Sequence, residues 1–203
     1  MNSALHSSRF LKWLYPTLIW DKRTNQREVY LTFDDGPDPE VTTFVLETLR
    51  QYGFKATFFC IGENVKKHPN IFKEIISDGH RVGNHTYNHL NGFQTNTNEY
   101  ISNTELAAEL IHSNLFRPPY GRIKRMQIQE LSSIYDIVMW SILTGDFSSS
   151  LNPNKAIKQI QKLTRSGSIV VFHDSQKAFS NLTKILPEYC KFLSNNDFTP
   201  CIL

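Results

Sequence analysis

Two histidines, His85 and His89, stand four residues apart in the sequence and are candidate metal ligands. Residues at i and i+4 lie on one face of a helical turn, so both imidazoles could bind one ion. With one carboxylate they would form a set of three protein ligands, which leaves open positions for a water and a substrate oxygen. Such a set predicts a hydrolytic metal site, where the ion polarises a carbonyl and lowers the pKa of water toward ~7. Imidazole and carboxylate suit zinc, cobalt, manganese or iron, and among these we expect zinc.

The segment Asp34-Asp35-Gly36-Pro37 contains candidates for the carboxylate ligand that would complete this set. Neighbouring residues in a strand point to opposite faces. Asp34 and Asp35 can therefore share one site only where the strand ends and the chain turns, and Gly36-Pro37 supplies such a turn. Alone, this segment is weak evidence for a site, because such a segment is more often a polar turn without function.

β-rich segments and amphipathic helical segments alternate along the chain. Strands are expected at 29–33, 56–61, 80–84, 115–116, 137–142, 168–172 and 198–203. Helices are expected at 41–52, around 71–76, and at 100–111, 124–133, 153–166 and 182–193. Asp38-Pro39 is expected to begin the first helix and Gly53 to end it. Alternation of this kind predicts a mostly parallel sheet.

Polar side chains follow most of the expected strands at the point where each strand ends. They are Asp34-Asp35, His85, Arg117, Asp146 and His173-Asp174. Polar residues at so many strand ends are expected when all the ends converge around one mouth. In an open doubly wound sheet, only strands beside a switch point would carry them. We therefore predict an α/β fold that is a distorted (β/α) barrel, TIM-barrel-like, with about seven parallel strands.

Composition narrows the class of protein. The 203 residues are enough for one domain with an ordinary core. The 22 basic and 19 acidic residues give a net charge of +3, too slight to indicate a nucleic-acid partner. The three cysteines show no C-x-x-C spacing, which argues against a disulfide framework or a thiolate zinc site.

The first 27 residues carry an apolar stretch from Phe10 to Trp20, interrupted by Lys12 and Pro16. It is too short to span a bilayer and lacks the features of a signal peptide. We expect a segment packed on the domain through Trp13 and Trp20, or at most a weak membrane-surface contact. A cytoplasmic or membrane-peripheral location is therefore favoured, although the compartment stays open.

Several motifs together resemble those of the polysaccharide deacetylases, the NodB-homology domain of carbohydrate esterase family four. The matching segments, in family order, are Thr32-Phe33-Asp34-Asp35-Gly36, His85-Thr86-Tyr87-Asn88-His89, Arg117-Pro118-Pro119-Tyr120-Gly121 and Val170-Val171-Phe172-His173. The resemblance covers roughly 28–203 and implies a distorted (β/α) barrel. It therefore implies a catalytic domain over 28–203, with 1–27 as the appended segment.

The resemblance implies a role for each matched residue. The metal ligands would be Asp35, His85 and His89, and Asp34 would be the general base, held in place by Arg117. The backbone N–H of Tyr120 would help to hold the oxyanion. His173 would be the general acid, oriented by Asp146. Pro119, Tyr120 and Phe147 would contact the substrate.

The fourth motif departs from the family pattern, Asp-x-x-Asp-Trp. Here the aligned segment is Leu143-Thr144-Gly145-Asp146-Phe147. The first carboxylate, which would help to restrain Arg117, is replaced by Leu143. The tryptophan is replaced by Phe147, which keeps an apolar wall without the indole N–H.

The resemblance implies a metal-dependent hydrolase that removes acetyl groups from N-acetylated amino sugars of a glycan, of the peptidoglycan or chitin type. An acetylated carbohydrate is the expected partner. A second hypothesis keeps the chemistry on a small-molecule amide, an imide or an O-acetyl ester. A third, motivated by Leu143 and Phe147, is a carbohydrate- or metal-binding domain without catalysis.

Overall fold

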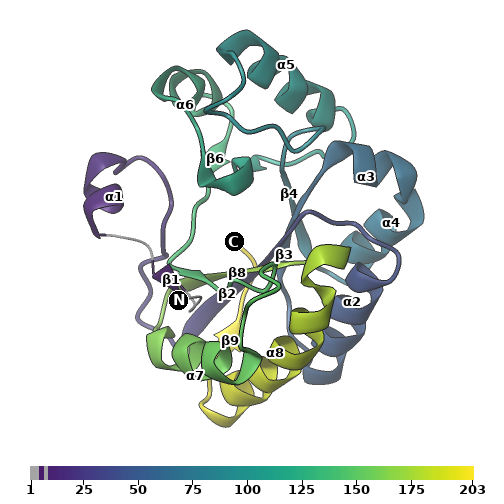
Figure 1. Ribbon diagram of the computed structural model, residues 1–203, viewed down its shortest axis with the longest axis vertical. Coiled ribbons are helices and arrows are strands. Elements are labelled where there is room, and N and C mark those ends of the chain that lie inside the picture. Colours follow the sequence, from purple (N-terminus) through teal and green to yellow (C-terminus); the bar gives the residue numbers. More distant parts are fainter. Residues whose placement is uncertain (1–4, 7–8) are drawn as a thin grey trace.

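The computed structural model describes residues 5–6 and 9–203. Its strands lie at the centre, with most helices arranged around them and α1 apart at one side (Figure 1). The strands are β1 (Leu5–His6), β2 (Glu28–Asp34), β3 (Thr57–Cys60), β4 (Arg81–Asn84), β5 (Leu115–Phe116), β6 (Asp136–Ile137), β7 (Ile142–Leu143), β8 (Ser168–His173) and β9 (Thr199–Pro200). The helices are α1 (Arg9–Leu14), α2 (Val41–Tyr52), α3 (Gly62–Lys67), α4 (Pro69–Ser77), α5 (Thr97–Ala108), α6 (Arg125–Leu131), α7 (Pro153–Leu163) and α8 (Gln176–Asn195), with a 3₁₀ turn at Pro119–Gly121.

The parallel strands follow the order β7-β8-β2-β3-β4-β5-β6 and form a curled sheet. β1 adds to β7 in the antiparallel sense, and β9 pairs with the start of β2. All seven parallel strands therefore point their carboxyl ends toward one side of the molecule. The predicted distorted (β/α) barrel is confirmed.

The segment before β2 lies between the two edges of the parallel sheet. Ile19 forms a parallel bridge with Val138, just after β6, and Asp21 forms an antiparallel bridge with Ser168 of β8. The N–H of Ile19 donates to the carbonyl of Ile137 at 2.9 Å, and the N–H of Lys22 donates to the carbonyl of Gly167 at 2.9 Å. This segment therefore links the end of β6, at one edge of the sheet, to the start of β8, the strand next to the other parallel edge strand.

The strand expected at 137–142 is divided into β6 and β7. The two halves belong to opposite edges of the sheet, because β6 pairs with β5 and β7 pairs with β8. The chain crosses from one edge to the other through Trp140 and Ser141, and the Ser141 N–H already donates to the carbonyl of Ile169. A continuous apolar pattern does not reveal such a change of partner.

Two further differences concern helices. Sequence reasoning missed α3, because its six residues carry only Val65 as a large buried side chain. The helix expected from Asp38 begins at Val41, although Asp38 Oδ1 still accepts from the N–H groups of Glu40 and Val41. The predicted stop at Gly53 is confirmed, and its left-handed φ of 66° suits glycine.

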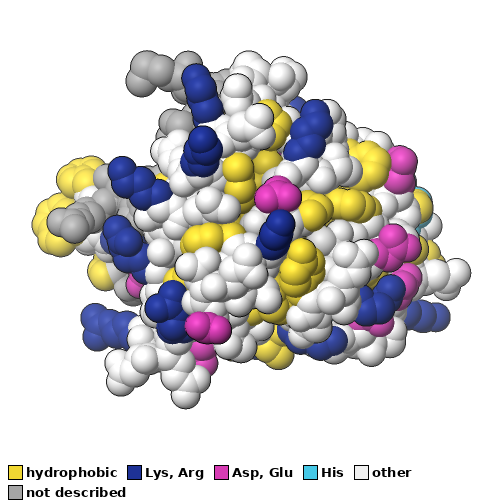
Figure 2. Space-filling view, turned by 90° about the horizontal axis from the view of Figure 1, so that it is seen from below, with side chains coloured by type: hydrophobic (Ala, Val, Ile, Leu, Met, Phe, Trp, Pro, Cys, Tyr) yellow, Lys and Arg dark blue, Asp and Glu magenta, His cyan; other side chains and the backbone are white. Residues whose placement is uncertain are grey.

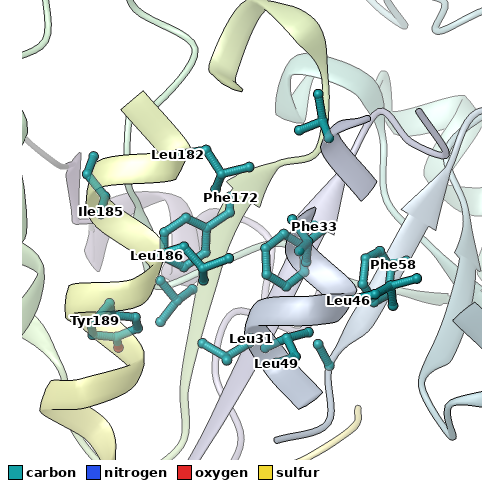
Figure 3. Close-up of a cluster of buried hydrophobic side chains, with 14 of the residues drawn as sticks. Leu31, Phe33, Leu46, Leu49, Phe58, Phe172, Leu182, Ile185, Leu186 and Tyr189 are labelled. Atoms are coloured by element: carbon teal, nitrogen blue, oxygen red, sulfur yellow. The ribbon is translucent and has the colours of Figure 1, made fainter. Parts of the chain in front are cut away.

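The main core lies between the sheet, α2 and α8 (Figure 3). Phe33 of β2 stacks on Phe58 at 5.0 Å and on Phe172 at 5.6 Å between ring centroids. Leu46 of α2 and Leu186 of α8 also belong to this buried cluster. The contacts fix β3, β2 and β8 side by side, so the residues that follow these strands are held at one end of a rigid core.

The two tryptophans expected to anchor the N-terminal segment differ in burial. Trp20 is 7% exposed, and its Nε1–H donates to the carbonyl of Tyr15 at 3.1 Å. Trp13 is 75% exposed, so the expectation that it is an anchor was wrong. Trp13 lies on α1, a six-residue helix that leaves most of its apolar side chains on the surface.

Across the described ranges, 5–6 and 9–203, no helix is long and apolar enough to cross a membrane. On the face seen in Figure 2, lysine and arginine side chains are scattered among neutral surface, with acidic side chains between them. That distribution fits the small net charge of +3.

Candidate active site

The two neighbouring carboxylates reach one site because β2 ends between them. Asp34 is the last residue of β2 and lies opposite His173 in the register with β8. Asp35 has a φ of 87°, which breaks the strand geometry and turns its side chain to the same mouth. The next residue, Gly36, must be small, because a Cβ there would lie 1.9 Å from Asp174 Oδ2.

The segment that carries His85 and His89 is an irregular loop after β4, so the expectation of a helical turn was wrong. Thr86 and His89 both have left-handed φ values, 63° and 56°. The Thr86 N–H donates to Asn84 Oδ1 at 2.8 Å. Asn103 Oδ1 on α5 accepts from the N–H groups of Tyr87 and Asn88. These contacts bring the imidazole centroids of His85 and His89 within 5.1 Å of each other.

Asp35, His85 and His89 form a cluster suited to one divalent ion. Each offers a ligand atom, and these atoms all lie within 4.8 Å of one another. Asp35 Oδ1 lies 3.2 Å from His89 Nε2 and 3.8 Å from His85 Nε2. This oxygen is buried without a hydrogen-bond partner among the described residues. A buried carboxylate oxygen of this kind, facing two imidazole nitrogens, suits a divalent cation as its partner.

The protonation states of this cluster also suit a cation. Burial of His85 lowers its pKa to about 4, so the imidazole is neutral at pH 7. His85 Nδ1 lies 2.7 Å from the carbonyl of Arg117, which it can reach only as a donor, and Nε2 is thereby left as the ligand atom. Burial alone would raise the pKa of Asp35, but the nearby His89, His173 and His85 hold it below its usual range.

Arg117 is fully buried and fixes Asp34. Its Nη1 donates to Asp34 Oδ1 at 2.6 Å and to Thr32 Oγ1 at 2.8 Å. Nε and Nη2 donate to the carbonyls of Val138 and Met139 at 3.2 and 2.9 Å. The guanidinium also lies over the ring of Phe59, 4.1 Å from its centroid. Arg117 is therefore restrained although Leu143 replaces a carboxylate.

Asp146 and His173 form a second pair. His173 Nδ1 lies 2.7 Å from Asp146 Oδ1, and the backbone N–H of His173 donates to Asp146 Oδ2 at 2.8 Å. Burial by itself would lower the pKa of His173, but the charge and hydrogen bond of Asp146, with Asp35 and Asp34 nearby, raise it to about 9. The imidazole is therefore protonated at neutral pH. Asp146 contacts the ring through Nδ1 and not through Nε2.

One cavity of ≈ 510 Å³ joins these groups. Its lining includes Asp34, Asp35, His85, His89, Tyr120, Trp140, Leu143, Phe147 and His173. The ring of Tyr120 lies 4.6 Å from that of His89, and the ring of Phe147 lies 4.9 Å from that of His173. Pro119 is buried and does not line the cavity, whereas Pro118 does, so we transfer the proposed substrate contact from Pro119 to Pro118.

Sequence reasoning missed two residues that contact Asp35. Ser175 Oγ donates to Asp35 Oδ2 at 3.2 Å. Asn64 Nδ2, at the start of α3, donates to the carbonyl of Asp35 at 2.7 Å. The position of Ser175, two residues after His173 at the end of β8, could have indicated it. Nothing in the sequence around Asn64 separates it from a surface asparagine.

Comparison with known proteins gives consistent matches. The family model described as Polysaccharide deacetylase matches residues 21–134, more than half of the chain. Two Bacillus cereus proteins, both named peptidoglycan-N-acetylglucosamine deacetylase, are each 36% identical to it. One alignment covers 81% of this chain and 64% of that relative, and the other covers 89% and 91%. The chain thus spans less than two thirds of the first relative's length.

The fold also matches a solved structure. The crystal structure of a peptidoglycan N-acetylglucosamine deacetylase in complex with a naphthalenyl N-hydroxybenzamide superposes with a TM-score of 0.86. The two chains are 32% identical, and the match covers 95% of this chain and 94% of that one.

Proposed function

The chain belongs to the polysaccharide deacetylase family, and from that premise we propose that it removes acetyl groups from N-acetylated amino sugars of a glycan. The relatives' names favour peptidoglycan as the glycan, with chitin oligomers as the alternative of the same chemistry. The observation that carries the proposal is that Asp34, His173 and the cluster of Asp35, His85 and His89 all border one cavity.

The proposed metal ligands are Asp35, His85 and His89, and zinc is the proposed ion. When bound, a divalent ion at this cluster polarises the acetyl carbonyl and lowers the pKa of water toward ~7. Ser175 keeps Asp35 Oδ2 oriented, so that Oδ1 faces the two imidazoles.

Asp34 is the proposed general base that takes a proton from the attacking water. The buried guanidinium of Arg117 donates to one oxygen of this carboxylate, Asp34 Oδ1, at 2.6 Å. The rigid placement of Arg117 limits the motion of Asp34, and this orientation is part of what makes a base effective.

His173 is the proposed general acid that gives a proton to the leaving amine. Asp146 keeps Nδ1 protonated and directs Nε2 away from itself, toward the cavity that His173 lines. The contribution of Asp146 to the raised pKa persists when a cation balances Asp35.

The remaining cavity residues hold the acetamide. We propose that the backbone N–H of Tyr120 stabilises the oxyanion, and that Tyr120, Pro118 and Phe147 contact the substrate. Phe147 places an apolar ring against His173, which helps to exclude water from the leaving-group side.

The test is release of acetate by zinc- or cobalt-loaded protein from N-acetylglucosamine oligomers and peptidoglycan fragments, followed by mass spectrometry. O-acetyl xylan and a small cyclic imide serve as the ester and small-molecule arms. Release from the amide glycans supports the proposal. Turnover of the ester or the imide alone would assign the same chemistry to another substrate.

Asp34→Asn separates an enzyme from a binding domain. We expect acetate release to fall by ~10²–10⁴-fold, because the general base is lost, while the bound metal content stays unchanged. Asp136→Asn, in an exposed carboxylate of β6, is the matched control and should keep full activity. Glycan binding without turnover by the wild-type protein would contradict catalysis.

A further inference from the structure

An apolar groove adjoins the catalytic cavity. It has a volume of ≈ 360 Å³, and none of its lining side chains is charged. The lining residues are Leu11, Leu14, Tyr15, Leu18, Trp20, Phe93, Tyr120, Gly121, Ile123, Met139 and Trp140. One wall comes from α1 and the segment after it, and the other comes from the loops after β4, β5 and β6.

The groove is continuous with the catalytic cavity. Tyr120, Gly121 and Trp140 line both. Gly121 has a φ of 65°, and a Cβ there would lie 2.5 Å from the Trp140 ring, so the backbone packs directly on the indole. Tyr120 holds its ring between the groove and His89, 4.6 Å from the imidazole centroid. A molecule in the cavity can therefore extend past Tyr120 into the groove.

The two compartments differ in chemistry. Carboxylates, imidazoles and two cations, Arg122 and Lys177, border the catalytic cavity. The groove is mostly apolar: its only polar side-chain groups belong to Tyr15, Trp20, Tyr120 and Trp140, and the Trp20 Nε1–H already donates to the carbonyl of Tyr15. Sugar hydroxyls placed against its leucine, isoleucine and methionine side chains would lose water without gaining partners. An alkyl chain would gain from leaving water at no such cost.

We propose that this groove binds an apolar alkyl substituent carried by the acetylated substrate. The proposal rests on the proposed function, because it takes the acetamide to lie at the cluster of Asp35, His85 and His89. Continuity with the cavity favours a chain attached to the substrate over a separate partner. The exposed apolar side chains Leu11 and Phe93 are then the groove's rim, which substrate covers on binding.

The experiment compares methyl, butyl, hexyl and octyl glycosides of N-acetylglucosamine with the metal-loaded enzyme. We expect kcat/KM for acetate release to rise about two- to fourfold per added methylene until the groove is filled, mainly through a lower KM. A kcat/KM that does not change with chain length would overturn the proposal.

Leu11→Ser combined with Phe93→Ser tests the location. These residues are 41% and 57% exposed, so the protein should stay folded. We expect the chain-length effect to disappear while the rate on the methyl glycoside is unchanged. Ile76→Ser with Ile134→Ser is the matched control, since both side chains are similarly exposed and line neither compartment. If the Leu11→Ser, Phe93→Ser variant keeps the full chain-length effect on kcat/KM, the alkyl chain does not bind in this groove and the proposal is overturned.

A lipid bilayer is the alternative occupant of the groove. Sedimentation with vesicles made of equal parts of phosphatidylglycerol and phosphatidylcholine tests for it. Vesicle binding that needs Leu11 and Phe93, without a chain-length effect, would assign the surface to a bilayer and overturn the proposal. Absence of acetate release from every glycoside and glycan would instead contradict the proposed deacetylase function, which separates the two failures.

Discussion

Around Arg117, backbone carbonyls replace a carboxylate that the family's fourth motif commonly supplies. Val138 and Met139 lie just after β6 and present both carbonyls to the guanidinium, and Phe59 covers one of its faces. A buried arginine needs its donors satisfied, because unpaired charge in a low dielectric is costly. Leu143 is therefore free to line the cavity as an apolar wall.

In the proposed mechanism Asp146 is a positioning residue that acts through His173, and this role predicts an effect on the pH dependence of the rate. A pKa of about 9 keeps His173 protonated at neutral pH, and the acid is lost as pH rises through that value. Asp146→Asn removes the nearest negative charge, so the pKa falls. We expect the alkaline limb of the kcat/KM profile to move down by about 1–2 pH units.

The pH profile distinguishes this role from a purely structural one. If Asp146→Asn lowers the rate while leaving the limb in place, Asp146 only supports the local backbone. Asn181→Ala is a useful comparison, because its side chain holds the carbonyl of Asp146 and not the carboxylate. Asn181→Ala should lower the rate less than Asp146→Asn does, and it should leave the alkaline limb of the kcat/KM profile in place.

At the scale of elements, α5 holds the loop that carries the two histidines. Asn103 Oδ1 accepts from two backbone N–H groups of that loop, and Asn103 Nδ2 donates to Asn88 Oδ1 at 3.0 Å. Asn103→Ala should loosen the loop and lower metal affinity by about 10-fold, as loss of outer-shell partners does. Activity at saturating metal should change much less.

Metal titration by calorimetry checks this expectation. Asn98→Ala, on the same helix with an exposed side chain, is the matched control and should leave the affinity unchanged. Equal affinities for the two variants would mean that the left-handed residues of the loop hold the histidines without help from α5.

His80 joins the starts of β3 and β4, away from the cavity. Its Nδ1 accepts from the N–H of Ala56 at 3.2 Å, and burial together with Lys55 lowers its pKa to about 4. In the unfolded chain a histidine titrates near ~6.5. Below that pH the unfolded state binds the proton first, so stability is lost as pH falls from ~6.5 to 4, by about 1–3 kcal/mol.

His80→Asn should reduce the loss of stability between pH ~6.5 and 4. The amide oxygen of asparagine can accept the same hydrogen bond and does not titrate. Urea unfolding at several pH values between 7 and 4 measures the difference between wild type and variant. Parallel curves would show that His80 contributes nothing to the acid sensitivity. His85 also has a lowered pKa, but it is present in both proteins and cancels in the comparison.

At the scale of the whole molecule, the segment before β2 completes the wall between β6 and β8. Trp20 belongs to a buried cluster with Leu18, Tyr100, Phe116 and Met139. Trp20→Ala should cost about 3–5 kcal/mol of the free energy of unfolding, because it leaves a large cavity at the junction of the sheet edges.

Trp13 provides the matched control for that prediction. It is the same residue type in the same segment, but its side chain is mostly exposed. Trp13→Ala should stay within about 0.5 kcal/mol of wild type in urea unfolding. If both variants lost the same stability, the burial of Trp20 would not be what stabilises the closure.

The fold class and the meeting of polar residues at one mouth could be predicted from the sequence. Both depend on local features: a strand ending at Asp34-Asp35, two histidines close in the chain, and polar residues after successive β-rich segments. In a parallel sheet those ends share one side, so the order of elements alone brings the residues together. The end of α2 before Gly53, the start of α7 at Pro153 and the position of β8 also followed from local periodicity and turn residues.

Features that depend on partners far along the chain were decided only by the tertiary structure. The helical turn expected at His85–His89 is replaced by a loop held by Asn103, and one expected strand is divided between two sheet edges. The restraint of Arg117 comes from Val138 and Met139, and the groove beside the cavity comes from α1. Local sequence specifies which groups are present and which elements they follow, whereas long-range hydrogen bonds and burial decide their final geometry.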